Sequence, residues 1–271
     1  MTVAPVAERI PVLLYHAVTD DPPGWIARFT VSPKVFGEQL AAIADSGRTA
    51  VTATQLVDGL AGRAVLPDRP VVITIDDGFA DLPAFTAPAL ADRGLTATAY
   101  LTTGALGPTP APDNLLPPAP MMTLRQASEV RACGLEVGAH TITHPQLDTL
   151  RPATVRRELS EPKAVLEDAL GCPVPAFAYP HGYSSPRVRR LVREAGYTSA
   201  TAVRNALSSV RDEPYRIARL MLTNTDTAAD VARWMAGEGA PVAPHPEGAK
   251  TVGWRWYRRA RTTLSGPTFA G

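Results

Sequence analysis

Two adjacent carboxylates stand at the end of an apolar segment, where residues 74–78 read Thr-Ile-Asp-Asp-Gly. Most of residues 71–75 are β-branched, which predicts a buried strand with Asp76 and Asp77 at its carboxyl end. Ligands bind at that end of the strands in parallel α/β proteins. Neighbouring acids repel each other there unless a cation or a shared proton separates their roles. The pattern therefore favours a chemical site, and the alternative is a solvated Asp-Gly turn.

Two histidines follow another predicted strand, because His140 and His144 come directly after residues 135–139. Histidines four residues apart can meet on one face of a helical turn and bind the same metal ion. This spacing alone is a weak signal. Together with Asp77 it makes a set of two imidazoles and one carboxylate, and three protein ligands with an open position are typical of a catalytic metal site.

A third strand end carries the sequence Tyr179, Pro180, His181 and Gly182. Proline and glycine at this point predict a sharp turn of the backbone. Such a turn can direct a main-chain N–H toward a developing oxyanion. An ordinary strand-ending turn is the alternative.

The segments that position these residues alternate between apolar strands and amphipathic helices. Strands are predicted at residues 12–15, 71–75, 96–101, 135–138, 177–179, 197–203 and 217–222. Helices are predicted from Ser32-Pro33, Thr123 and Ser185-Pro186 and over residues 79–93, 153–170 and 228–235, with a kink or break at Pro162. This alternation predicts an α/β fold with a parallel sheet. About seven units favour a barrel-like closure, although periodicity alone also allows an open sheet.

Composition excludes several classes of protein. The 271 residues are 45% hydrophobic and 20% charged, which is ordinary for a globular protein. The net charge of +1 gives no indication of a nucleic-acid partner. Cys133 and Cys172 form no C-x-x-C pair, so a redox motif or zinc knuckle is not indicated. We see no leader and no apolar stretch long enough to span a bilayer, so we expect a cytoplasmic protein.

The chain changes character near residue 241, which divides it into a domain at residues 1–240 and a tail at residues 241–271. The tail starts as a Pro-rich linker and then combines basic with aromatic residues, namely Lys250, Arg255, Arg258, Arg259 and Arg261 with Trp254, Trp256 and Tyr257. This combination suits weak, salt-sensitive contact with an anionic membrane surface, which would make the protein peripheral to a membrane. The alternative is that the tail packs its tryptophans on the domain and leaves its arginines in water.

The three strand-end motifs, in this order, resemble those of the polysaccharide deacetylases of carbohydrate esterase family 4, the NodB-homology group. The resemblance covers roughly residues 10–225 and implies a distorted (β/α) barrel of about seven strands. It implies that Asp76 is the general base and that Asp77, His140 and His144 hold one divalent metal ion. Zinc is favoured, and cobalt or nickel would also suit two imidazoles and one carboxylate. The Tyr179 N–H would bind the oxyanion.

The sequence departs from the family pattern in two places. Many members carry an arginine at the start of the third motif, where this chain has Ala178 or Tyr179. Arg219 is the predicted substitute, reaching Asp76 from another strand. Many members also have a late histidine that acts as general acid. Here His16, after the first strand, resembles the branch in which this acid motif is permuted to the N-terminus; a structural histidine at a strand end is the alternative.

The resemblance implies a metal-dependent enzyme that removes N-acetyl groups from an amino sugar in a saccharide or glycoconjugate. Two other functions stay open. One is a different amide or ester hydrolase on the same scaffold. The other is a non-catalytic carbohydrate-binding relative, against which the intact aspartates and histidines argue. A contact of His181 with substrate is a further hypothesis.

Overall fold

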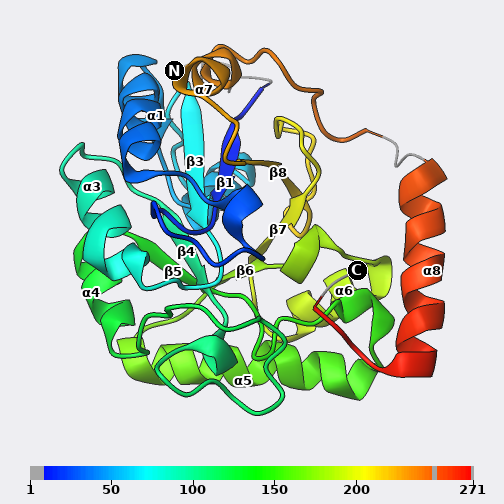
Figure 1. The fold of residues 1–271 in the computed structure, drawn as a ribbon. Coiled ribbons are helices and arrows are strands. Elements are labelled where there is room, and N and C mark those ends of the chain that lie inside the picture. Colours follow the sequence, from blue (N-terminus) through cyan, green and yellow to red (C-terminus); the bar gives the residue numbers. More distant parts are fainter. Residues whose placement is uncertain (1–8, 246–248, 270–271) are drawn as a thin grey trace.

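The apolar strands of the chain close into a parallel barrel. The computed structural model describes residues 9–245 and 249–269. Strand β1 pairs in parallel with both β3 and β8, and the remaining strands follow in sequence order between those two, which closes the ring (Figure 1). The predicted distorted barrel of about seven parallel strands is confirmed, and the two-residue strand β2 adds to the edge of β3. The strands are β1 (Val12–Tyr15), β2 (Thr49–Ala50), β3 (Pro70–Ile75), β4 (Thr98–Leu101), β5 (Glu136–Ala139), β6 (Ala176–Ala178), β7 (Ser199–Val203) and β8 (Ile217–Met221).

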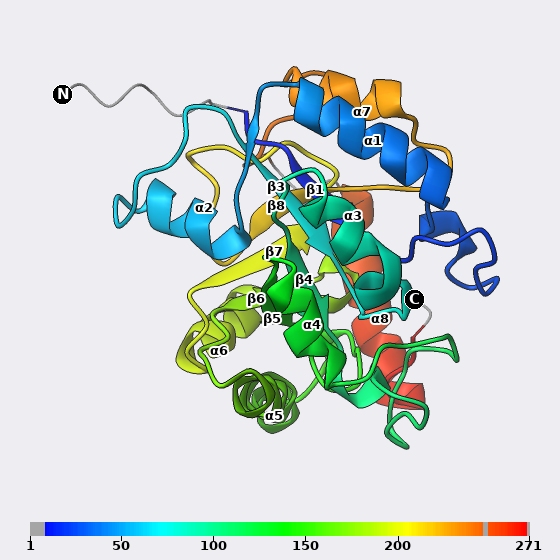
Figure 2. The same ribbon diagram turned by 90° about the vertical axis from the view of Figure 1, so that its left-hand side faces the viewer.

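Helices surround this barrel, and α1 packs beside α7 on one side while α5 lies on the other (Figure 2). Local signals in the sequence define several of their starts. The Ser32 side chain accepts a hydrogen bond from the Val35 N–H, and Ser185 does the same for Val188. The helices are α1 (Pro33–Asp45), α2 (Ala53–Leu60), α3 (Ala87–Ala91), α4 (Gln126–Ala132), α5 (Pro152–Leu170), α6 (Pro186–Glu194), α7 (Ala228–Met235) and α8 (Ala249–Ser265).

Two of the predicted helices differ from the structure. The segment 79–93 forms a π-helix at Leu82–Thr86 followed by the short α3, because Pro83 and Pro88 each remove a backbone donor. Around Pro162 the predicted break is absent, since α5 continues through this proline. Buried residues before and after Pro162 pack that helix against the barrel, which offsets the lost hydrogen bond.

Side chains alternate between the inside and the outside of the barrel, as the period of a strand requires. Along β3, Val71 and Ile73 pack outward in the large core beneath the helices. Val72 points the other way and joins an inner cluster with Tyr100 of β4 and Ile217 of β8. The same alternation directs Asp76 and Arg219 inward.

The two ends of the barrel differ in chemistry. Helix α2 covers the amino-terminal end, where its Ala53 N–H donates to Thr98 Oγ1 over 2.9 Å at the start of β4. The carboxyl ends of the strands lie at the opposite end and carry the motifs identified in the sequence. In the described ranges, no helix combines the length and apolar character that a membrane span requires.

Candidate active site and metal centre

Asp76 and Arg219 form a buried ion pair in the mouth of the barrel. Arg219 Nη1 and Nη2 donate to the two carboxylate oxygens of Asp76 over 2.7 and 2.8 Å, and Nη1 also reaches Thr74 Oγ1 at 3.1 Å. Burial by itself opposes ionisation of Asp76. The charges of Arg219 and His140, with the hydrogen bonds from Arg219, outweigh that effect and hold the pKa of Asp76 below its usual value. Asp76 is therefore a fixed carboxylate, and the predicted contact with Arg219 is present.

Asp77 has different surroundings although it is the next residue. Its backbone is left-handed, with φ of 75°. Both carboxylates approach the same atom, since Asp76 Oδ2 and Asp77 Oδ1 lie 3.7 and 3.6 Å from His140 Nε2. Its Oδ1 atom is buried and accepts no hydrogen bond. Burial and the charge of Asp76 raise the pKa of Asp77 well above the ordinary value. A carboxylate in this position requires a nearby cation to be stable in its ionised form.

The two histidines converge on Asp77. The Nε2 atoms of His140 and His144 lie 3.6 and 3.4 Å from Asp77 Oδ1. The His140 Nδ1 atom is 2.8 Å from the Ala178 carbonyl oxygen, and as a donor to that oxygen it leaves Nε2 unprotonated toward Asp77. Burial lowers the pKa of both imidazoles, most strongly for His144, which favours the neutral form that binds metals.

The histidines lie on an irregular loop rather than on the helical turn that their spacing predicted. Thr141 and His144 both have left-handed backbones, with φ of 70° and 60°. The loop is held by the buried Glu158 of α5, whose Oε2 atom accepts from the N–H groups of Ile142 and Thr143 over 2.8 and 3.0 Å. This support comes from a residue that sequence reasoning missed, because a glutamate inside a helix gives no signal of such a role.

The three predicted ligands fit a divalent metal ion. One ligand atom from each of Asp77, His140 and His144 lies within 4.8 Å of the others, and all three residues are buried. An unpartnered carboxylate oxygen beside two neutral imidazoles is a donor set suited to zinc, cobalt or nickel. These residues could therefore hold one ion, with Asp76 next to it.

His16 lines the same cavity from the end of β1. The residue is half-buried, and its buried Nδ1 atom has no hydrogen-bond partner. Burial outweighs the attraction of Asp76 and lowers the pKa of His16 to about 4. The His16 imidazole is therefore neutral at pH 7 in the protein alone, without a bound ion or substrate.

Tyr179 has no N–H available to bind an oxyanion, contrary to the prediction. Its N–H donates to the Thr201 carbonyl oxygen over 3.1 Å within the sheet, and its hydroxyl donates to the Tyr215 carbonyl oxygen over 2.9 Å. The prediction that the Tyr179 N–H faces an oxyanion is therefore corrected. The turn continues to His181, which has a left-handed φ of 56° and a ring centroid 4.7 Å from that of His144. Within residues 9–245 and 249–269, the backbone N–H of His181 donates no hydrogen bond to another backbone group.

The cavity over these residues has a volume of about 230 Å³ and an aromatic rim. Phe269, near the end of the chain, has its ring centroid 5.7 Å from that of His144 and 5.5 Å from that of His181. It also meets Trp25 edge-to-face at 5.1 Å. Sequence reasoning missed both aromatic residues, since each stands in an irregular segment far from the motifs.

The tail contacts the site through α8 rather than extending from it. Arg258 is buried and donates to both carboxylate oxygens of Asp148 over 2.9 and 3.0 Å. Its guanidinium also lies 3.6 Å from the ring centroid of Tyr183. Trp256 is 66% exposed. The alternative, with tryptophans packed on the domain and arginines in water, therefore holds only in part. Trp254 donates to the Tyr183 hydroxyl as it expects, whereas Trp256 is exposed and Arg258 is buried because Asp148 supplies an ionic partner.

Comparison with known proteins gives consistent matches. The family model described as polysaccharide deacetylase matches residues 63–200, slightly more than half of the chain. The Bacillus subtilis (strain 168) protein YxkH, which is named for the same family, is 21% identical over 215 residues. The match covers 79% of this chain and 72% of YxkH.

Solved structures show the same barrel. The Streptococcus pyogenes deacetylase PplD, solved in complex with acetate, matches with a TM-score of 0.73 and 23% identity over 84% of this chain and 98% of that chain. IcaB from Ammonifex degensii matches with a TM-score of 0.70 and 25% identity over 85% and 98% of the two chains. A de-N-acetylase from Aggregatibacter actinomycetemcomitans has a TM-score of 0.71 at 19% identity, covering 83% and 99%.

Proposed function

Because this chain belongs to the polysaccharide deacetylase family, we propose that it is a metal-dependent hydrolase that removes the N-acetyl group of an amino sugar. The observation that supports this best is the meeting of Asp77, His140 and His144 within 4.8 Å of one another, directly beside the Asp76–Arg219 pair. A bound divalent ion supplies Lewis acidity, which lowers the pKa of water and polarises a carbonyl group. Zinc is the favoured ion.

Asp76 is the proposed general base. Its low pKa keeps it ionised, and the two hydrogen bonds from Arg219 fix the orientation of its carboxylate. It takes a proton from the water that attacks the acetyl carbonyl carbon. Arg219 therefore positions the base, in the place of the arginine that the third motif lacks.

His16 is the proposed proton donor to the leaving amine. With a pKa of about 4 it gives up a proton readily once it is protonated. Negative charge that develops on the substrate raises the pKa of a nearby imidazole and favours that protonation. The oxyanion itself requires a donor, and in place of Tyr179 we assign the N–H of His181, which no described acceptor occupies.

The test combines metal content with acetate release. The protein is loaded with zinc, cobalt or nickel, and acetate is measured across N-acetylated saccharides, sugar nucleotides, glycosides and acetyl esters. His140→Ala and His144→Ala should lose both the ion and acetate release, since each removes one of three ligands. Full metal occupancy in either variant would contradict the assigned site. Release from esters alone would assign the chain to ester hydrolysis, and ligand binding without release would indicate a carbohydrate-binding relative.

A further inference from the structure

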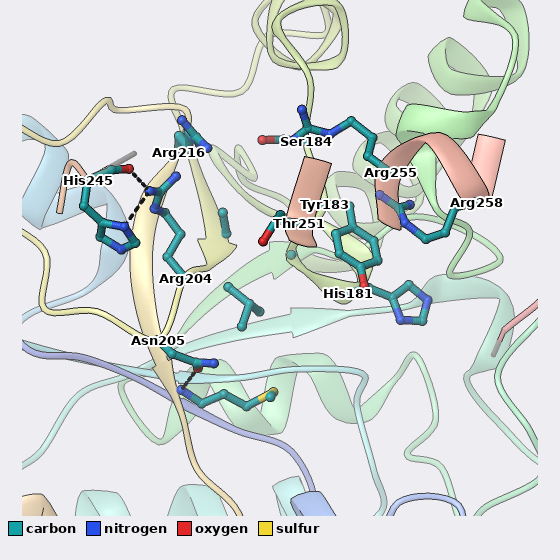
Figure 3. Close-up of a pocket in the computed structure, with 14 residues that line it drawn as sticks. His181, Tyr183, Ser184, Arg204, Asn205, Arg216, His245, Thr251, Arg255 and Arg258 are labelled. Atoms are coloured by element: carbon teal, nitrogen blue, oxygen red, sulfur yellow. Dashed lines mark hydrogen bonds between the residues drawn. The ribbon is translucent and has the colours of Figure 1, made fainter. Parts of the chain in front are cut away.

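A second cavity, of about 370 Å³, lies beside the metal cavity and is lined by arginines. Figure 3 shows Arg204 and Arg216 on one side of it and Arg255 and Arg258 on the other. Arg204 follows β7, Arg216 precedes β8, and the other two belong to α8. Residues far apart in the sequence thus bring guanidinium groups to one place. The described lining residues include no aspartate or glutamate.

The contacts of two of these arginines show how the charge is distributed. Arg258 is balanced by its ion pair with Asp148. Arg204 Nη2, by contrast, donates to the neutral His245 carbonyl oxygen, and the buried Arg204 Nε has no hydrogen-bond partner. The charge of Asp212 acts on Arg204, but the Asp212 Oδ2 atom accepts its hydrogen bonds from Ser208 and from the Ala218 N–H instead. A buried N–H donor without a partner is costly unless an acceptor reaches it. The unpartnered Nε of the half-buried Arg204 therefore favours an anionic acceptor within the cavity.

The two cavities share a wall, since His181, Gly182, Tyr183, Val203 and Met221 line both. A ligand group in the arginine-lined cavity is therefore next to the place where an acetamido group would lie. The His181 Nε2 atom is buried at this wall without a partner, so it is a further polar atom available to a ligand.

We propose that the arginine-lined cavity binds a phosphoryl or diphosphoryl group of the substrate, so that the enzyme acts on a phosphorylated N-acetyl amino sugar. This inference rests on the proposed deacetylase function. Guanidinium groups pair with phosphate through parallel N–H bonds, and several of them match a group that carries about two negative charges better than a single carboxylate. Ser184, Asn205 and Thr251 add neutral polar groups to the lining.

Binding is tested first without any metal, which separates this cavity from the metal site. Inorganic pyrophosphate is titrated calorimetrically into the full chain in the presence of a chelator. Arg204→Gln should weaken binding about tenfold, because it removes a charge-assisted bond. Arg255→Gln should also weaken pyrophosphate binding about tenfold. Because Arg255 lies on a different element, this variant keeps the test valid if Arg204→Gln fails to fold. Arg211→Gln is the matched control, because Arg211 is exposed and lines none of these cavities.

The second arm measures acetate release by the zinc-loaded enzyme from N-acetylglucosamine 1-phosphate and from free N-acetylglucosamine. The kcat/KM for the phosphorylated sugar, divided by that for the free sugar, should exceed one. This ratio should fall about tenfold in Arg204→Gln and Arg255→Gln. An unchanged ratio, or equal pyrophosphate binding by all variants, would overturn the phosphate site. A higher kcat/KM for N-acetylneuraminic acid than for N-acetylglucosamine 1-phosphate would overturn it in favour of a site for a carboxylate. Tight pyrophosphate binding with no acetate released from any compound would instead contradict the deacetylase function and leave the anion site standing.

Discussion

Asp76 and Asp77 are neighbours in the sequence, yet the structure gives them opposite electrostatic surroundings. Arg219 lowers the pKa of the first against the effect of burial, whereas burial and Asp76 raise the pKa of the second. Asp76→Asn should retain the metal and lose about 10²-fold or more in turnover, because it removes the proposed base. Asp77→Asn should weaken metal binding, because it removes a proposed ligand. Metal content and kcat measured side by side check both roles, and exchanged phenotypes would show that the assignments are reversed.

The Asp76–Arg219 pair predicts a specific pH dependence. Arg219 lowers the pKa of Asp76, and a general base must be ionised to act. Arg219→Lys loses the bidentate contact, so the pKa of Asp76 should rise and the acid limb of kcat/KM should move upward by about one pH unit. The profile is recorded at saturating metal, with the exposed Arg211→Lys as control. An acid limb at the same pH in Arg219→Lys and in the unmodified enzyme would show that Asp76 is not the titrating base.

His16 lies in the cavity without a partner on Nδ1, which suits a group that exchanges a proton with substrate. His16→Ala should fold and bind metal like the unmodified enzyme but lose about 10²-fold in kcat. Equilibrium metal binding and thermal unfolding serve as controls for a purely structural effect. A variant with nearly full turnover would mean that another group or solvent protonates the amine.

At the scale of elements, α8 presents aromatic side chains outward. Trp256 and Tyr257 are 66% and 55% exposed, which agrees with the hypothesis of weak contact between the tail and an anionic membrane surface. Removing the tail would also remove Arg258 and Phe269 from the site, so point variants are the better test. Trp256→Ser should reduce co-sedimentation with phosphatidylserine vesicles at low salt severalfold, and high salt should abolish binding by the unmodified protein.

The matched control for that experiment is Val65→Ser, because Val65 is 99% exposed in a loop remote from α8 in the sequence. Equal and negligible vesicle binding by the unmodified protein and by both variants would remove the membrane hypothesis. The packing role of α8 would then be sufficient to explain its sequence, since Arg258 and Trp254 both contact Tyr183.

At the scale of the whole molecule, two distant segments line the cavity over Asp77, His140 and His144. Trp25 and Phe269 meet over it at 5.1 Å and limit its volume to about 230 Å³. Phe269→Ala should widen the cavity and raise kcat/KM for an N-acetylated tetrasaccharide relative to the monosaccharide by about tenfold. Leu264→Ala, an exposed change in α8, is the control. An unchanged ratio would show that Phe269 does not limit substrate length.

The sequence by itself determined those parts of the fold that depend on neighbouring residues. Strands such as 12–15, the helix starts at Ser32 and Ser185 and the presence of acids and histidines at strand ends follow from patterns a few residues long, because capping bonds and strand periodicity are local. The resemblance added the order of the motifs and so the expected metal ligand set. Both therefore placed Asp77, His140 and His144 correctly at one end of the barrel.

Only the tertiary structure decided which of these groups touch. The bidentate contact of Arg219 with Asp76 spans 143 residues of sequence and exists because the closed ring turns both side chains inward. The Tyr179 N–H donates to the Thr201 carbonyl oxygen of the neighbouring strand, and no sequence pattern around Tyr179 predicts this hydrogen bond. Phe269 contacts His144 in a segment that follows α8, and the ion pair of buried Arg258 with Asp148 helps to hold that helix on the domain. Such contacts depend on strand register and on the packing of distant segments, and these are properties of the whole chain rather than of any local stretch of it.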